Sequence, residues 1–147
     1  MRRIVTYDKP MLAFRYIVIG VILSVGASSH AQEPSAIKSI YFGGGSFYID
    51  EMQSEELSQF IAKHLSTGQF NITVHSHTDD IGGAEYNAWL SQMRSETVIQ
   101  KLIESLIERE AIQIKDFGQF NPVYDNSTWE GRFKNRRVDV ILWPIVL

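Results

Sequence analysis

The stretch His75-Ser76-His77-Thr78-Asp79-Asp80-Ile81-Gly82-Gly83 separates two segments that have different hydrophobic periods. Before it, residues 70–74 alternate apolar and polar side chains, which is typical of a half-buried strand. After it, an apolar stripe repeats at helical spacing over Val98, Ile99, Leu102 and Leu106. We therefore expect a strand that runs into His77, a turn at the glycines, and a helix from about Ala84 to about Glu110.

The turn places an acid and a base near each other. Asp79 ends the expected strand, and Asn87, Leu90 and Arg94 lie three and seven positions apart on one face of the expected helix. A carboxylate and a guanidinium could hold the ammonium and the carboxylate of a small zwitterion. Spacing alone favours a structural role, in which Asp79 caps the helix and pairs with Arg94. Both interpretations remain open at this point.

The rest of the chain supplies three more strands and one more helix. Strands are expected at residues 37–42, 112–118 and 138–143, and a polar loop at residues 119–136. Asp50 and Gln53 resemble a capping box in front of a helix that Gly68 ends. The order β-α-β-α-β-β predicts an α+β fold: a two-layer sandwich with a mixed four-stranded sheet and two helices on one face.

The first 31 residues differ from the rest. Basic residues precede an apolar run at residues 16–25, and Ser29-His30-Ala31 resembles a cleavage site. We expect residues 1–31 to be a secretory signal peptide and residues 32–147 to be the folded domain. An uncleaved anchor is the alternative, although the apolar run is short against the roughly 20 residues of a membrane-spanning helix. Met11 is an alternative start.

Composition narrows the classes of partner. Four of the 14 Lys and Arg residues and one of the 17 Asp and Glu residues lie before Gln32, which leaves ten basic and 16 acidic residues. A net charge of about −6 does not favour binding to nucleic acid or to anionic lipid. The chain contains no cysteine, which excludes disulfides, a thiol nucleophile, cysteine-ligated zinc and a lipoprotein cysteine.

Two long motifs carry a resemblance to a known family. The first has the form G-H-T-D-x-x-G-x-x-x-x-N-x-x-L-S-x-x-R-A and is matched from Ser76 to Ser95. The second has the form G-x-x-x-P…N-x-T-x-x-G-R-x-x-N-R-R-V and is matched from Gly118 to Val138. Over residues 37–142 the chain resembles the OmpA-like peptidoglycan-binding domain, found in outer-membrane protein A, peptidoglycan-associated lipoprotein and the stator protein MotB.

The resemblance implies a ligand and a set of binding residues. Domains of this family bind the peptide stem of peptidoglycan non-covalently, chiefly through diaminopimelate, and so anchor an envelope protein or complex to the cell wall. Their conserved acid and base, which grip the amino and carboxyl groups at the side-chain end of that residue, correspond to Asp79 and Arg94. Positions that line or support the pocket correspond to Thr78, Asn87, Leu90 and Arg137, with Phe42 nearby.

The chain departs from the family pattern at three places. Ser76 replaces the usual glycine, Ser95 replaces the usual alanine, and the loop after the first strand reads Gly43-Gly44-Gly45-Ser46. Side-chain hydrogen bonds from that loop to a ligand are therefore lost or replaced by backbone amides. The resemblance implies a periplasmic protein that is associated with the cell wall. A location at the periphery of the outer membrane is compatible with this expectation.

The sequence leaves two alternatives to peptidoglycan binding. His75 and His77 share one face of a strand and could bind a metal with Asp79 or Asp80, but two histidines are a weak signal. No set of nucleophile, base and orienting residue is evident, so we expect a binding protein without a cofactor rather than an enzyme. The second alternative is an interaction subunit of a secretion or motility machine, with exposed aromatic residues contacting protein partners.

Overall fold

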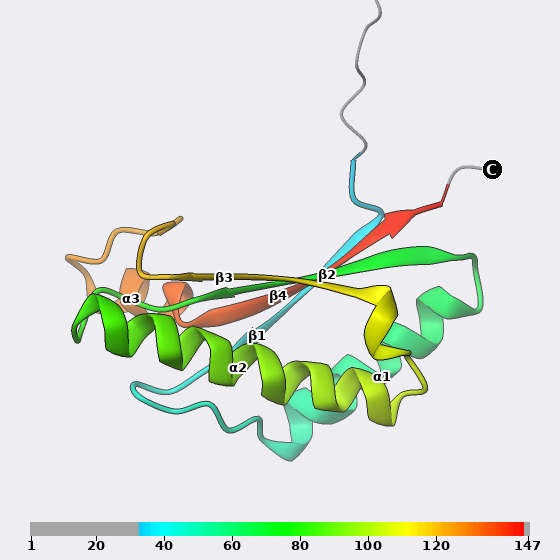
Figure 1. The fold of residues 1–147 in the computed structure, drawn as a ribbon, viewed down its shortest axis with the longest axis horizontal. Helices are drawn as coiled ribbons and strands as arrows, with labels where there is room; N and C mark the ends of the chain where they lie inside the picture. Colours follow the sequence, from blue (N-terminus) through cyan, green and yellow to red (C-terminus); the bar gives the residue numbers. More distant parts are fainter. Residues whose placement is uncertain (1–32, 146–147) are drawn as a thin grey trace, which may run out of the picture. The chain divides into compact units, whose positions relative to one another are not determined.

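The computed structural model describes residues 33–145 of the chain. The predicted signal peptide lies outside the described residues, and no helix among those described is long and apolar enough to cross a membrane. The elements run along the chain from cyan to red in Figure 1. In order they are β1 (Ala36–Tyr41), α1 (Glu51–Leu65), β2 (Phe70–His77), α2 (Ala84–Glu104), a short 3₁₀ turn (Arg109–Ala111), β3 (Ile112–Gly118), α3 (Trp129–Asn135) and β4 (Arg137–Pro144).

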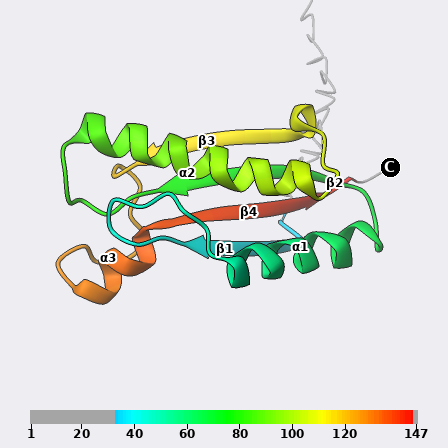
Figure 2. The same cartoon turned by 90° about the horizontal axis from the view of Figure 1, so that it is seen from below.

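The four strands form one mixed sheet in the order β1-β4-β2-β3. β4 pairs antiparallel with both β1 and β2, whereas β2 and β3 are parallel. Figure 1 shows α1 and α2 on the same side of this sheet, and Figure 2 shows them lying along it. The predicted α+β class, the mixed four-stranded sheet and the two helices on one face are confirmed.

The hydrophobic core lies between the sheet and the two long helices. Alternate residues of β2 and β4 point toward the helices, as expected for strands with one covered face. The helices contribute apolar side chains spaced three or four residues apart. The buried set includes Ile72, Val74, Val138, Val140 and Leu142 of the sheet, Leu57 and Ile61 of α1, and Val98, Ile99 and Leu102 of α2.

The capping box at the start of α1 forms and also reaches the sheet. Asp50 accepts a hydrogen bond from the backbone N–H of Gln53 at 2.8 Å. The Gln53 side-chain amide in turn binds both backbone groups of Tyr41, at 2.8 and 3.1 Å. Because β1 is an edge strand, these bonds occupy a donor and an acceptor that the sheet leaves free. They fix the start of α1 against the end of β1.

Two predicted boundaries were wrong. α2 ends at Glu104 rather than near Glu110, because the N–H of Ile107 turns back to the carbonyl of Leu102. Leu106 then has a φ of 67° and is 92% exposed, so it does not extend the apolar stripe. The segment predicted as a polar loop at residues 119–136 contains α3, which is capped by the Thr128 side chain. Seven residues are too few to show a helical period in the sequence.

Candidate functional site

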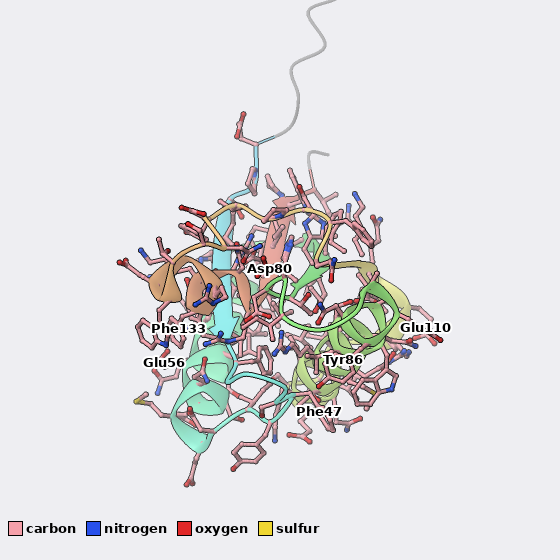
Figure 3. The ribbon with its side chains drawn as sticks, turned by 90° about the vertical axis from the view of Figure 1, so that its left-hand side faces the viewer. Phe47, Glu56, Asp80, Tyr86, Glu110 and Phe133 are labelled. Carbon is pink, nitrogen blue, oxygen red and sulfur yellow. The ribbon has the colours of Figure 1, made fainter. Side chains whose placement is uncertain are left out.

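A pocket of about 260 Å³ lies where β2 passes into α2. Four segments build it: the loop after β1, the turn between β2 and α2, the first turns of α2, and the junction of α3 with β4. Figure 1 shows these segments gathered at the same end of the molecule, and Figure 3 views that end. The lining residues are Gly44, Gly45, Asp79, Ile81, Gly82, Tyr86, Leu90 and Arg136.

Asp79 is held by the turn and by an arginine from the other end of the sequence. One carboxylate oxygen accepts a bond from Arg136 Nη1 at 2.9 Å, and the other accepts from the Ile81 N–H at 3.3 Å. Asp79 is only 6% exposed, so the pair is largely shielded from water. Asp79 does not cap α2, whose N-cap residue is Gly83. The predicted capping role is therefore wrong, and the observed ion pair is with Arg136 rather than Arg94.

Arg94 lies behind the pocket and is fully buried. Its guanidinium donates to the carbonyl oxygens of Ser46, His77 and Gly43 at 2.9, 3.1 and 3.1 Å. It also lies 5.1 Å from the centre of the Phe42 ring. Two of the three carbonyls belong to the loop after β1, so Arg94 fixes that loop over the pocket.

Arg94 remains positively charged although it is buried. Burial lowers the pKa of Arg94 to about 10; the charge of Asp79 raises this pKa and the charge of Arg136 lowers it. At neutral pH the guanidinium is still protonated. Asp79 therefore lies in the field of two arginines, one in direct contact and one behind it. This arrangement favours an anion at the pocket as well as the carboxylate that the protein already supplies.

The other predicted residues either line the pocket or contact the residues around it. Leu90 lines the pocket. Asn87 is buried and donates to Gln119 Oε1 at 2.7 Å, which ties α2 to the segment after β3. Thr78 is buried, and its hydroxyl donates to the carbonyl of Asp79 at 2.9 Å. Phe42 packs under the Arg94 guanidinium. Thr78 is thus in contact with Asp79, and Phe42 with Arg94.

Arg137 does not line this pocket, although its neighbour Arg136 does. The Arg137 guanidinium donates from Nε to Asp139 at 2.9 Å on the face of the sheet away from the helices. Arg137 is the first residue of β4, whereas Arg136 precedes the strand as the C-cap residue of α3 and from there reaches Asp79. Arg136 was not among the predicted site residues. The second motif contains both arginines, but the motif alone does not indicate which of the two faces Asp79.

Tyr86 explains why glycines surround the pocket. Gly82 has a φ of +105°, and an added Cβ would lie 3.0 Å from Tyr86 Cδ1. Gly45 has a φ of +67°, and its Cβ would lie 3.3 Å from the Tyr86 hydroxyl. Both positions combine a left-handed backbone with a close approach, so larger residues would be strained there. The Gly43–Ser46 loop is thus shaped to pack against Tyr86.

The histidines of β2 pack on an aromatic ring. The His77 ring stacks on Phe117 with centres 5.0 Å apart, and His75 meets the same ring edge-on at 5.3 Å. His77 Nε2 lies 3.9 Å from Asp139. Within residues 33–145, no group of three or more histidine, cysteine, aspartate or glutamate side chains is placed to hold a metal ion. The geometry gives the histidines a packing role.

Comparison with known proteins places the chain in a family. The family model described as "OmpA family" matches residues 41–136, which is most of the described domain. The chain belongs to the OmpA family. The resemblance inferred from the two motifs is therefore confirmed.

Individual relatives agree with this assignment. The chain is 38% identical over 74 residues to probable lipoprotein YiaD of Escherichia coli, covering 50% of this chain and 34% of that protein. It is 29% identical over 103 residues to peptidoglycan-binding protein ArfA of Mycobacterium tuberculosis, covering 70% of this chain and 32% of that protein. The chain thus spans about a third of the length of either relative.

A solved structure supports the fold. The crystal structure of the peptidoglycan-associated lipoprotein from Burkholderia pseudomallei superposes with a TM-score of 0.66 at 27% sequence identity. The match covers 71% of this chain and 89% of that one. The predicted fold class is therefore confirmed both by the architecture of this domain and by its similarity to a solved OmpA-like domain.

Proposed function

We propose that this protein binds the peptide stem of peptidoglycan non-covalently through diaminopimelate, and that it anchors an envelope protein or complex to the cell wall. Membership of the OmpA family and the similarity to a peptidoglycan-binding protein support the proposal. The observation that carries it is the shielded pocket in which Asp79 meets Arg136 in front of the buried Arg94. The role is binding rather than catalysis, and the compartment is the periplasm, reached after removal of residues 1–31.

The pocket suits an ammonium and a carboxylate on one carbon. In the free protein the carboxylate of Asp79 and the guanidinium of Arg136 satisfy each other. A bound zwitterion replaces this ion pair with two new ones, because its ammonium pairs with Asp79 and its carboxylate pairs with an arginine. No charge is left buried and unpaired in that exchange, which avoids the main cost of binding a charged group in a shielded site.

The carboxylate has two arginines available. Arg136 lines the pocket and reaches it directly. Arg94, which the family resemblance assigns to this contact, reaches the ligand only when a carboxylate oxygen replaces the carbonyl of Gly43 or Ser46. We propose that Arg136 makes the first contact with the carboxylate. Arg94 adds positive charge behind the pocket, and it binds the carboxylate when the loop after β1 moves. A charge-assisted, bidentate bond is stronger than the neutral carbonyl contacts it replaces.

Co-sedimentation with purified sacculi tests the proposal. Asp79→Asn removes the negative charge and nearly preserves the shape, so the variant should stay in the supernatant. Breaking a desolvated charge pair costs roughly 2–5 kcal/mol, which is more than tenfold in affinity. Asp80→Asn is the matched control, because Asp80 is exposed and is not among the pocket residues. Circular dichroism checks that both variants fold. An Asp79→Asn variant that pellets like the wild type would refute the assignment.

The same assay identifies the ligand by competition. A stem tripeptide that ends in diaminopimelate carries an ammonium and a carboxylate on one carbon at its side-chain end, whereas the same tripeptide ending in lysine carries only the ammonium there. Without that carboxylate the arginines gain no bidentate partner. The diaminopimelate tripeptide should therefore release the protein from sacculi at concentrations at which the lysine tripeptide does not. Equal release by both tripeptides would show that the side-chain carboxylate is not recognised.

A further inference from the structure

We propose that Phe47, Tyr86 and Trp89 form a second subsite beside the pocket, which binds a sugar ring of the glycan strand. We call these three side chains the aromatic patch. The inference rests on the proposed function, because it adds a carbohydrate contact to the peptide contact of the same ligand. It concerns side chains that the Asp79 pocket leaves partly uncovered.

The aromatic patch is continuous with the pocket. Tyr86 lines the pocket, and Trp89 follows it by three residues on α2, with ring centres 5.7 Å apart. Phe47 comes from the loop after β1, and its ring centre lies 6.0 Å from that of Trp89, edge against face. Figure 3 labels Phe47 and Tyr86 at the same end of the molecule, on these two different segments. The loop that Arg94 fixes therefore also carries part of the patch.

These rings are not needed for the core. Phe47, Tyr86 and Trp89 are 38%, 44% and 47% exposed, and none belongs to the buried cluster between the sheet and the helices. Adjacent large aromatic side chains that stay half exposed forgo the free energy of burial. Contiguous exposed apolar surface is a feature of binding sites. A ligand that covers these rings would recover that free energy.

A sugar ring fits the chemistry of the aromatic patch. One face of a pyranose presents C–H groups, which pack on the electron-rich face of an aromatic ring, while its hydroxyl and amide groups remain in water. The three patch residues carry no charge, which suits a neutral sugar better than a charged peptide. Two stem residues separate diaminopimelate from the sugar, a span of roughly 7–10 Å, so a ligand whose diaminopimelate lies in the pocket places its sugar on the neighbouring surface.

A second aromatic group on the other side of the pocket is less suited to this role. Phe133 stacks on Tyr41 at 5.7 Å and on Trp129 at 5.9 Å, and the rings of both pairs are nearly parallel. The Arg136 guanidinium lies 5.6 Å from the centre of the same Phe133 ring. The Phe133 ring thus already stacks on protein groups, although the residue is 37% exposed. Trp129 is nevertheless 71% exposed, which makes it a matched control for the loss of an exposed tryptophan.

The test compares two soluble ligands by titration calorimetry. One is the stem tripeptide ending in diaminopimelate, and the other is the same tripeptide attached to its disaccharide. We expect the wild-type protein to bind the disaccharide form more tightly. Trp89→Ala and Phe47→Ala should each weaken binding of the disaccharide form about three- to tenfold and leave the affinity for the bare tripeptide unchanged. Trp129→Ala should change neither affinity.

The outcomes separate this inference from the proposed function. If the wild type binds both ligands equally, or if Trp89→Ala leaves the disaccharide affinity unchanged, the sugar subsite is refuted while peptide recognition stands. An aromatic patch that serves a protein partner would give this result. If Trp89→Ala weakens both ligands alike, the patch acts on the peptide pocket and not on a sugar. If the wild type binds neither ligand, the proposed function fails and the sugar subsite fails with it.

Discussion

Two adjacent arginines have different surroundings in this domain. Arg136 contacts Asp79 in the pocket, and Arg137 contacts Asp139 on the opposite face of the sheet. Methionine at either position keeps a long apolar stem and removes the charge. Arg136→Met should reduce sacculus binding more than tenfold, because Asp79 loses its partner and the ligand carboxylate loses its direct contact. Arg137→Met should leave binding within about twofold, since its guanidinium does not reach the pocket.

Stability should distinguish the same two variants from a general folding defect. Arg137→Met leaves Asp139 half-buried without its ion pair, so its melting temperature should fall although binding persists. Co-sedimentation and thermal denaturation measure the two effects separately. Loss of binding in Arg137→Met at a temperature where the protein is folded would contradict the placement of the two side chains.

Individual site residues were predictable to different degrees. The proximity of Asp79, Leu90 and Arg94 follows from their spacing within one strand-turn-helix unit, where local geometry decides which side chains share a face, whereas their assignment to a binding site came from the family resemblance. The partner of Asp79 lies 57 positions away, so it depends on how α3 and β4 return to the pocket. The burial of Arg94 was likewise not evident, because its partners are backbone carbonyls that have no sequence signature.

Among the secondary-structure elements, α3 determines the position of Arg136. The helix starts at the Thr128 cap, and Arg136 is its C-cap residue. Asn135 stabilises the preceding loop, since its side chain accepts from the N–H groups of Val123 and Tyr124 and donates to Tyr124 and Asn126. The strands and the two long helices were predictable from hydrophobic period, whereas α3 is defined by caps and by this network of hydrogen bonds.

Gly131 in α3 tests this dependence. A methyl group on Gly131 would overlap the backbone carbonyl oxygen of Asp125, which cannot move aside like a flexible side chain. Gly131→Ala should destabilise the domain by about 1–3 kcal/mol, the usual cost of overpacking, and should weaken sacculus binding by displacing Arg136. Urea denaturation and co-sedimentation measure both effects.

Gly68→Ala serves as the comparison. Its added methyl would lie 3.6 Å from the Phe70 ring, which is an ordinary contact far from the pocket. We expect a change within about 0.5 kcal/mol and unchanged binding. If Gly131→Ala were as stable as Gly68→Ala, α3 would not be packed against the Asp125 loop as described.

The whole domain has one sheet face covered by helices and one face without them. The covered face carries the apolar core, and the other carries His77, Arg137 and Asp139. The order of strands and helices made this layering predictable, because two amphipathic helices and four strands have few ways to bury their apolar sides. The close packing of charged groups and histidines on the other face was not predictable, because it results from the register of β2 against β4.

That register makes the stability of the molecule depend on pH. His77 is almost fully buried, with Phe117 stacked on its ring and with Asp139, Arg137 and His75 around it. Burial, together with the charges of Arg137 and His75, lowers the pKa of His77 to about 4, and the charge of Asp139 acts in the opposite direction. The folded state therefore favours neutral His77, whereas the unfolded chain titrates at the ordinary value of 6.5.

His77 should therefore make the domain less stable in acid. Between pH 6.5 and about 4 the unfolded chain binds more protons at His77 than the folded domain does, so acidification should favour unfolding. The contribution is complete above pH 6.5 and declines through this window by up to about 3 kcal/mol. Urea denaturation of the wild type and of His77→Gln at several pH values measures it. The variant cannot take up that proton, so its stability should fall less steeply from pH 6.5 to 4, whatever its stability at pH 7. Parallel curves for the two proteins would show that His77 is not the group responsible.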